Sequence, residues 1–177
     1  YIQTHKEPEL NTYIDSLLKT SYVGMLQCHS GNDIIDAVIN CKSAEAKALD
    51  IQFSFITGLY TPIQIDPTDI CGVLANQLDN AFDACKLISD PKDRIVRVEI
   101  KQIEDMVFFI VKNTVKSDPF ETDPQLHSVK KDDGKRHGYG LTNIRAIAEK
   151  YNSCMQTEYF SGSFVSSVSL CCKPLDT

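Results

Sequence analysis

The sequence predicts a two-layer α/β sandwich built on a mixed β-sheet. Strand-forming runs come in two hairpin pairs, at 94–112 and 155–171, and one further run stands alone at 51–56. Amphipathic helices lie between these runs, which favours a layer of helices packed on a sheet. A doubly wound parallel fold would need a helix between most successive strands, and the chain does not supply them.

Residues 1–22 predict a helix that comes before the pattern of a compact domain begins. Apolar residues recur there at helical spacing: Leu10, Tyr13, Ile14, Leu17 and Leu18. Such a seam packs either against another helix or subunit or within the core of the same domain, and both alternatives stay open. Because the chain begins at Tyr1 without Met, we expect it to be a fragment of a larger protein.

A helix and a strand open the compact domain. A capping box at Ser30-Gly31-Asn32-Asp33 predicts a helix over 31–48. The run at 51–56 alternates in polarity and is rich in β-forming residues, which predicts a strand with one buried face.

The next helix is the best marked, and it runs from Asp66 until it fades near Ser89. Asp66 can cap it, Pro67 fits its first turn, and Asp69 sits three residues past the cap. Apolar residues recur at three- and four-residue spacing along one face of this helix, which predicts that the face is buried. They are Ile70, Val73, Leu74, Leu78, Ala81, Cys85 and Ile88.

The second half begins with a predicted turn at 90–93 and antiparallel strands at 94–103 and 106–112. From 113 to 137 the pattern dissolves into a long loop of mixed charge, and loops of that length are usually lids or binding segments. A helix follows Gly138, with one apolar face. The last hairpin joins strands at 155–160 and 163–171 across Ser161-Gly162.

The composition excludes several classes of protein. With 42% hydrophobic and 24% charged residues, the chain has the composition of a soluble globular domain. It has no apolar run of the roughly 20 residues that span a bilayer, and no signal peptide opens it. The net charge of −6 argues against a nucleic-acid partner. Its seven cysteines form no zinc-ligand pattern and are typical of reduced structural thiols in a cytosolic protein.

A polar stripe marks the candidate site. Asn76, Asn80 and Asp83 fall at i, i+4 and i+7 of the helix that begins at Asp66. Asn and Asp in a helix interior cost roughly half a kcal/mol each relative to Ala, since their side chains compete for backbone hydrogen bonds. One explanation is a solvated face, although such faces usually favour Glu, Lys and Gln. The other is a row of oxygen ligands for a hydrated hard cation and, through it, a phosphate chain.

Two weaker signals accompany this stripe. Gly138 and Gly140 open a helix, where glycines let the backbone approach a phosphate, or else form a simple tight turn. Asn113 follows a strand of buried type, and an amide there can both donate to and accept from a purine edge, although strands often end in Asn.

The combination and its order resemble the GHKL ATP-binding fold, which is also known as the Bergerat fold. This fold is shared by gyrase, the MutL mismatch-repair protein, a heat-shock chaperone and the sensor histidine kinases. The asparagine box is matched by Asn76-Gln77-Leu78-Asp79-Asn80-Ala81, and the second glycine box by His137-Gly138-Tyr139-Gly140-Leu141-Thr142-Asn143-Ile144. More narrowly, the chain resembles the catalytic domain of Agr/VirS-type quorum-sensing histidine kinases. That likeness extends to the segment from Gly31 to Asn40, with Lys42 and Ala46-Lys47, and it covers about residues 8 to 172.

The resemblance implies that residues 1–22 are the end of a dimerisation and phosphotransfer helix and that 23–177 form an ATP-binding catalytic domain. It also implies Mg²⁺ as cofactor and a lid at about 114–137. It implies that Asn80 binds Mg²⁺, that Asn76 is the catalytic residue supporting metal or phosphates, and that Asn113 recognises adenine. The other nucleotide-binding residues would be Asp83 on the helix, Lys135, Arg136 and His137 in the lid, and Gly138, Gly140 and Leu141 at the helix start.

This chain departs from the family pattern at three positions. The segment Val111-Lys112-Asn113-Thr114-Val115 has neither the Asp nor the glycines of the usual first glycine box, although the Agr-type branch also uses Asn. Asp83 stands where many histidine kinases carry Lys, so phosphate charge must be met by the metal, the helix end and the lid cations. Asn76 stands where hydrolytic members carry a Glu that activates water, and because an amide cannot take a proton, fast ATP hydrolysis is disfavoured.

The function implied is therefore transfer of the γ-phosphoryl group of ATP to a separate histidine, followed by passage to a response regulator. None of His5, His29, His127 and His137 lies on a helix beside an acidic residue, so we expect the acceptor to precede Tyr1. The full protein would be a membrane-anchored homodimer with this domain in the cytoplasm. The alternative is a nucleotide-binding interaction module of the same fold without kinase activity.

Overall fold

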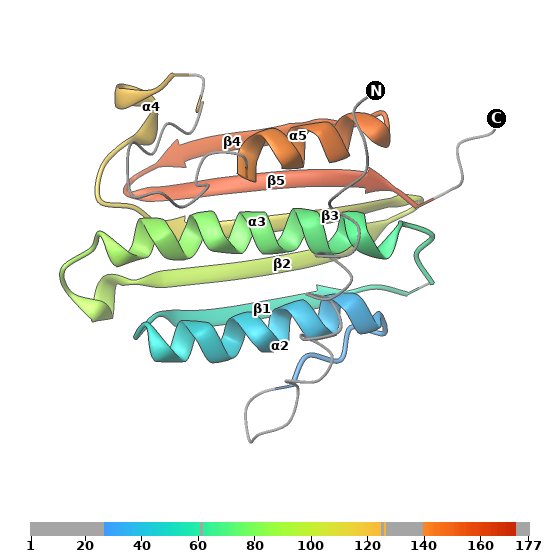
Figure 1. Cartoon of the computed structure of the whole chain (residues 1–177), viewed down its shortest axis with the longest axis horizontal. Helices are drawn as coiled ribbons and strands as arrows, with labels where there is room; N and C mark the ends of the chain where they lie inside the picture. The colour runs from blue at the N-terminus through green and yellow to red at the C-terminus, as the bar shows by residue number, and fades with distance from the viewer. Residues whose placement is uncertain (1–26, 61, 125, 127–139, 173–177) are drawn as a thin grey trace, which may run out of the picture.

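A computed structural model of the chain describes residues 27–60, 62–124, 126 and 140–172, and all structural statements below concern these residues. Five strands form one mixed sheet in the order β1-β2-β3-β5-β4. The main helices, α2 (Asp33–Ala48), α3 (Pro67–Lys86) and α5 (Gly140–Lys150), lie in a second layer on this sheet (Figure 1). This arrangement confirms the predicted two-layer α/β sandwich. The predicted helix within 1–22, and with it the proposed boundary at residue 23, lies outside the described residues.

The sheet consists of β1 (Gln52–Gly58), β2 (Ile95–Ile103), β3 (Met106–Thr114), β4 (Met155–Phe160) and β5 (Ser163–Cys171). β1 pairs with β2 in parallel, and the other three pairs are antiparallel. Both predicted hairpins are confirmed. The β4–β5 turn places Ser161 and Gly162 at φ values of 47° and 75°, in the left-handed region that glycine adopts at little cost.

The ends of α3 follow its local chemistry. The Asp66 carboxylate accepts hydrogen bonds from Thr68 N at 2.8 Å and Thr68 Oγ1 at 2.6 Å, as expected of a helix cap. These bonds lower the pKa of the Asp66 carboxyl, with the Thr68 hydroxyl making the largest contribution. The helix ends at Lys86 rather than near Ser89, because Asp90 caps a separate 3₁₀ turn, η1 (Pro91–Asp93). Ile88 is accordingly only partly buried, whereas the other six apolar residues of the predicted face are buried.

The start of α2 corrects the predicted capping box. Asn32, not Ser30, caps the helix, and its Oδ1 accepts from Ile34 N and Ile35 N, both at 3.1 Å. Ser30 Oγ instead donates to Asp36 Oδ1 at 2.6 Å. The helix therefore begins two residues later than predicted, since Gly31 has a φ of 86°, which is not helical.

The predicted loop at 113–137 contains regular structure at its start. β3 continues to Thr114 because Asn113 and Thr114 pair with Phe164 and Ser163 of β5. A single helical turn, α4 (Pro119–Thr122), follows and is capped by Asp118, whose carboxylate accepts from Phe120 N at 2.8 Å. Half of the expected lid, residues 125 and 127–137, lies outside the described residues.

All seven cysteines carry free thiols, in agreement with the sequence, although Cys154 is exposed. Burial raises the pKa of Cys28 to about 12 and that of Cys71 to about 11. Within the described ranges, no helix is long and apolar enough to cross a membrane.

Candidate functional site

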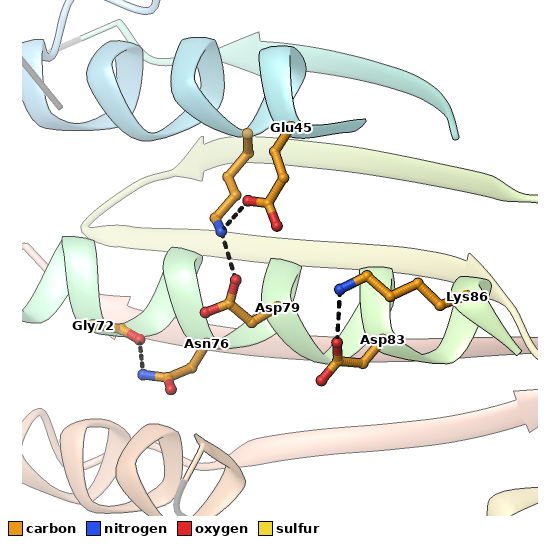
Figure 2. A network of polar contacts seen from close by, with 7 residues as sticks. Glu45, Gly72, Asn76, Asp79, Asp83 and Lys86 are labelled. Carbon is orange, nitrogen blue, oxygen red and sulfur yellow. Dashed lines mark hydrogen bonds and ion pairs between the residues drawn. The ribbon is translucent and has the colours of Figure 1, made fainter. Parts of the chain in front are cut away.

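α3 lies between α2 and α5, and its polar residues face in two directions (Figure 2). Asn76 lies on the side toward α5, whereas Asp79 points toward α2. Asp79 Oδ1 accepts from Lys42 Nζ at 2.5 Å, and the same ammonium contacts Glu45 Oε2 at 2.6 Å. Lys42 is buried, so Asp79 serves to neutralise a charge between two helices. Asp79 therefore does not belong to the candidate site. Its contact with Lys42 explains why an Asp is present there, although Asp is unfavourable in the interior of a helix.

The Asn76 amide has a defined orientation. Its Nδ2 donates to Gly72 O, one turn earlier, at 2.6 Å. A backbone carbonyl can only accept, so the amide nitrogen must be the end that faces it. The oxygen is therefore left for the neighbouring segment, as a metal or phosphate-supporting role for Asn76 requires.

That neighbouring segment is the start of α5. A Cβ added to Gly140 would lie 3.3 Å from Asn76 Oδ1, 3.3 Å from Asn80 Nδ2 and 3.4 Å from Asn80 Oδ1. The backbone at Gly140 thus touches both asparagines, which confirms that the asparagine stripe and the second glycine box meet in space. Because N–H groups at a helix start attract anions, a phosphate at this junction would meet both amides and the positive end of the helix dipole.

A polar cluster joins the first turn of α3 to the C-terminal end of α5. Asp69 Oδ2 accepts from Lys150 Nζ at 2.6 Å and from the Tyr151 hydroxyl at 2.8 Å. The hydrogen bond with Asp69 raises the pKa of Lys150, and burial raises the pKa of Tyr151 to about 12. At Gly72, a Cβ would come within 2.8 Å of Ile147 Cδ1, so α3 and α5 are in close contact there and the tip of the Ile147 side chain would have to shift for a larger residue. This packing fixes the position of Gly140 relative to the asparagines.

Asn80 has a donor that no described residue satisfies. Its Nδ2 is buried and has no hydrogen-bond partner among them. A buried amide of this kind fits a metal–phosphate group, because its nitrogen can donate to a phosphate oxygen and its oxygen can coordinate Mg²⁺. Elsewhere in the described part of the chain, no group of three His, Cys, Asp or Glu residues could hold a metal.

A cavity of about 230 Å³ lies between α3, β3, β5 and the start of α5. Its lining is mainly apolar, with a few polar groups, which is the usual chemistry of a site for a flat organic ring. Four predicted site residues take part: Asn80, Asp83, Asn113 and Leu141. The other lining residues are Gln77, Ala81, Ala84, Leu87, Val111, Val115, Pro119, Leu126, Phe164 and Ser166.

Asn113 and Asp83 differ in how free they are to contact a ligand. Asn113 is buried, and its Nδ2 donates to Thr114 O at 2.9 Å, so its oxygen is the end left for the cavity. Asp83 Oδ1 instead contacts Lys86 Nζ at 3.1 Å, one turn along α3 (Figure 2). That cation offsets the negative charge of Asp83, which stands where many histidine kinases carry Lys.

Gln77 is the site residue that sequence reasoning missed. It lies within the apolar face of α3 and is 2% exposed, yet it also lines the cavity. The sequence did contain a signal for it. Gln77 follows Val73 by four residues and Leu74 by three, so it is a polar residue at helical spacing from a buried apolar stripe. Lys135, Arg136, His137 and Gly138 lie outside the described residues, so their predicted roles stay predictions.

Comparisons with known proteins agree with this geometry. The model of a family described as the GHKL domain matches residues 65–171, more than half of the chain. The catalytic domain of the histidine kinase ThkA superposes with a TM-score of 0.65 at 21% identity, over 85% of this chain and 100% of that one. The mycobacterial sensor histidine kinase MprB gives 0.59 at 16% identity, over 80% and 97%.

A third structure is ThkA in complex with the response regulator protein TrrA. It gives a TM-score of 0.61 at 19% identity and covers 94% of this chain and 48% of that one. At these identities the likenesses show the fold. No curated protein sequence matches the chain significantly.

Proposed function

The chain belongs to the GHKL domain family, and on that premise we propose that it is the ATP-binding catalytic domain of a sensor histidine kinase. The observation that carries the proposal is the contact of Gly140 with the amides of Asn76 and Asn80, beside an apolar cavity that reaches Asn113. A triphosphate at the helix start and a base in the cavity would occupy these two neighbouring spaces. The fold likeness to catalytic domains of histidine kinases supports the same assignment.

In this proposal each described residue has a role set by its chemistry. Asn80 coordinates Mg²⁺ through its amide oxygen, and Asn76 supports the metal or phosphates with the oxygen that its bond to Gly72 leaves free. The magnesium ion neutralises phosphate charge when it is bound. Asn113 contacts the adenine, and Leu141 packs against it. Lys135 and Arg136 would close over the phosphates. His137 would contact a phosphate, and Gly138 would help to hold the phosphates at the helix start.

The reaction we propose is phosphoryl transfer to a protein histidine rather than hydrolysis. A hydrolase needs a base for water, and the Asn76 amide cannot accept a proton. The domain therefore contributes by positioning ATP for the transfer and by neutralising the charge of its phosphates. His29 is exposed and precedes the cap of α2, away from the cavity lining, so we do not assign it as the acceptor.

The partners we propose are a second copy of the full protein and a response regulator. The structure of ThkA with TrrA supports a regulator as the kind of partner for this fold. We further propose membership of the Agr/VirS branch and a cytoplasmic position in a membrane-anchored protein. The motif likeness from Gly31 to Asn40 supports the branch.

Transfer of label from [γ-³²P]ATP tests the proposal. The chain is incubated with Mg²⁺, labelled ATP and a separate fragment carrying the acceptor helix, and we expect acid-labile phosphohistidine on the fragment. The unusual first glycine box, with Asn113 in place of Asp, favours a second candidate, a nucleotide-binding interaction module without kinase activity. Binding without transfer would support that module, and steady phosphate release would support a hydrolase instead.

A further inference from the structure

We propose that Gln77 is a specificity-determining residue whose amide oxygen accepts a hydrogen bond from the exocyclic amino group of the bound base. The inference rests on the proposed function, since it takes the base of ATP to enter the cavity between α3 and the sheet. It assigns to Gln77 a role distinct from that of Asn113.

The orientation of the Gln77 amide follows from its partners. Nε2 lies 2.8 Å from Ser166 Oγ, 3.1 Å from Ser166 O and 3.3 Å from Phe109 O. Two of these three are backbone carbonyls, which can only accept hydrogen bonds. The nitrogen must therefore be the end that faces β3 and β5, and the oxygen is the end left over.

That oxygen is an unsatisfied acceptor. Gln77 Oε1 is enclosed and has no hydrogen-bond partner in the part of the chain that the structure describes. A buried polar atom without a partner is unfavourable, and native proteins rarely retain one without a reason. Because the Gln77 side chain also lines the cavity, a ligand with a correctly placed N–H group would supply the missing bond.

The position of Gln77 along the cavity indicates which part of a ligand it meets. Asn113, Val111 and Phe109 follow one another on the buried face of β3, with Asn113 next to the end of the strand. Asn113 therefore lies near the end of β3, whereas Gln77, which contacts Phe109 O, lies beside a point further back along the same strand. A base that contacts Asn113 would therefore present its opposite edge to Gln77.

The two amides define the chemistry of that edge. Asn113 and Gln77 each use the amide nitrogen on the protein backbone, so both offer oxygen acceptors to the cavity. The 6-amino group of adenine carries two N–H donors, whereas guanine has an acceptor oxygen at the same position. The oxygen of Gln77 and the 6-oxygen of guanine are both acceptors, and two acceptors that face each other in an enclosed site repel. Gln77 would therefore select ATP over GTP.

Calorimetric titration of the 177-residue chain with Mg²⁺ tests this. The ligands are ATP, purine riboside triphosphate, which lacks only the 6-amino group, and GTP. We expect the unmodified chain to bind ATP roughly ten-fold more tightly than purine riboside triphosphate, and GTP more weakly still. Gln77→Met, of similar size without the amide, should reduce the difference between ATP and purine riboside triphosphate several-fold, leaving only the share that Asn113 contributes. The control Gln102→Met removes another buried glutamine, outside the cavity lining, and should keep it.

A second measurement needs no variant. The side-chain amide resonances of Gln77 in the ¹⁵N-labelled chain should shift with ATP and stay in place with purine riboside triphosphate. Equal affinity of the unmodified chain for these two ligands would overturn the proposal, as would a preference that Gln77→Met leaves undiminished. If no nucleotide binds at all, the proposed function fails and this assignment fails with it.

Discussion

Asn76 Oδ1 lies so close to Gly140 that a Cβ on Gly140 would come within 3.3 Å of it. The two residues are 64 positions apart and belong to different helices, so the contact is made only in the folded domain. It brings a row of amides on α3 against the start of α5. In the GHKL domain this junction is where we propose that the triphosphate and its metal bind.

Gly140→Ala should weaken binding of Mg²⁺-ATP by at least about ten-fold, because the new methyl group displaces the amides of Asn76 and Asn80 by a few tenths of an ångström. Thermal stability should hold or rise slightly, since Ala favours a helix over Gly. Calorimetry and a thermal melt measure the two effects. Gly58→Ala is the matched control, as a Cβ there meets no atom within 4 Å. Unchanged ATP affinity in Gly140→Ala would contradict the site.

Asn80→Ala should abolish the Mg²⁺-dependent part of ATP binding and leave the fold intact. The buried Nδ2 of Asn80 has no partner among the described residues, so its removal costs the free protein no hydrogen bond there. Calorimetry with Mg²⁺ and with EDTA measures the metal dependence, and circular dichroism checks the fold. A variant that still responds to Mg²⁺ as the unmodified chain does would remove Asn80 from the metal site.

Asp79→Asn should lower the free energy of unfolding by about 1–3 kcal/mol, because it weakens the charge pairing of the buried Lys42 ammonium. Glu45→Gln should cost less, since Lys42 then keeps its contact with Asp79. Urea denaturation gives both values. ATP affinity should not change in either variant, because neither side chain lines the cavity. A loss of ATP binding without a loss of stability would argue against the structural role.

Alkaline pH should destabilise the domain through the Asp69 cluster. Burial raises the pKa of Tyr151 to about 12, so the unfolded chain releases this proton from about pH 10 while the folded chain retains it. The raised pKa of Lys150 acts in the same direction above its ordinary value of 10.5. Unfolding free energy should therefore fall between pH 10 and 12.

Buried thiols with raised pKa values contribute to the same fall, so the informative quantity is a difference between two proteins. Tyr151→Phe removes one titrating group. Its free energy of unfolding should therefore fall less steeply between pH 10 and 12 than that of the unmodified chain. Urea denaturation at each pH measures both. Parallel curves would show that the Tyr151 hydroxyl is not held neutral by the fold.

The features that could be predicted depend on residues near one another in the chain. The cap of α3 follows from Asp66 and Pro67, although Asp69, expected to take part, contacts Lys150 and Tyr151 instead. Both hairpins follow from alternating runs around short turns. The misplaced start of α2 shows the limit of this reasoning, because Ser30 and Asn32 are both good caps. The structure decides between them, since Ser30 bonds Asp36 and the left-handed backbone of Gly31 delays the helix start until after Asn32.

The candidate site was predictable as a set of residues but not as a geometry. Two separated motifs suggested that Asn76, Asn80 and Gly140 would meet, and the structure confirms it. The partners of Asp79 and Gln77 were not predictable, because they depend on contacts across 37 and 89 positions. Periodicity shows which face of a helix is buried, but not which polar group lies opposite it.

Calorimetric titration of the unmodified chain with ATP, with Mg²⁺ and then with EDTA, tests the central claim most directly. The account predicts saturable binding of one ATP per chain with Mg²⁺, and binding weaker by at least about ten-fold without it. Absence of binding under both conditions, or an affinity that Mg²⁺ does not change, would contradict a magnesium-bound triphosphate at Asn76, Asn80 and Gly140.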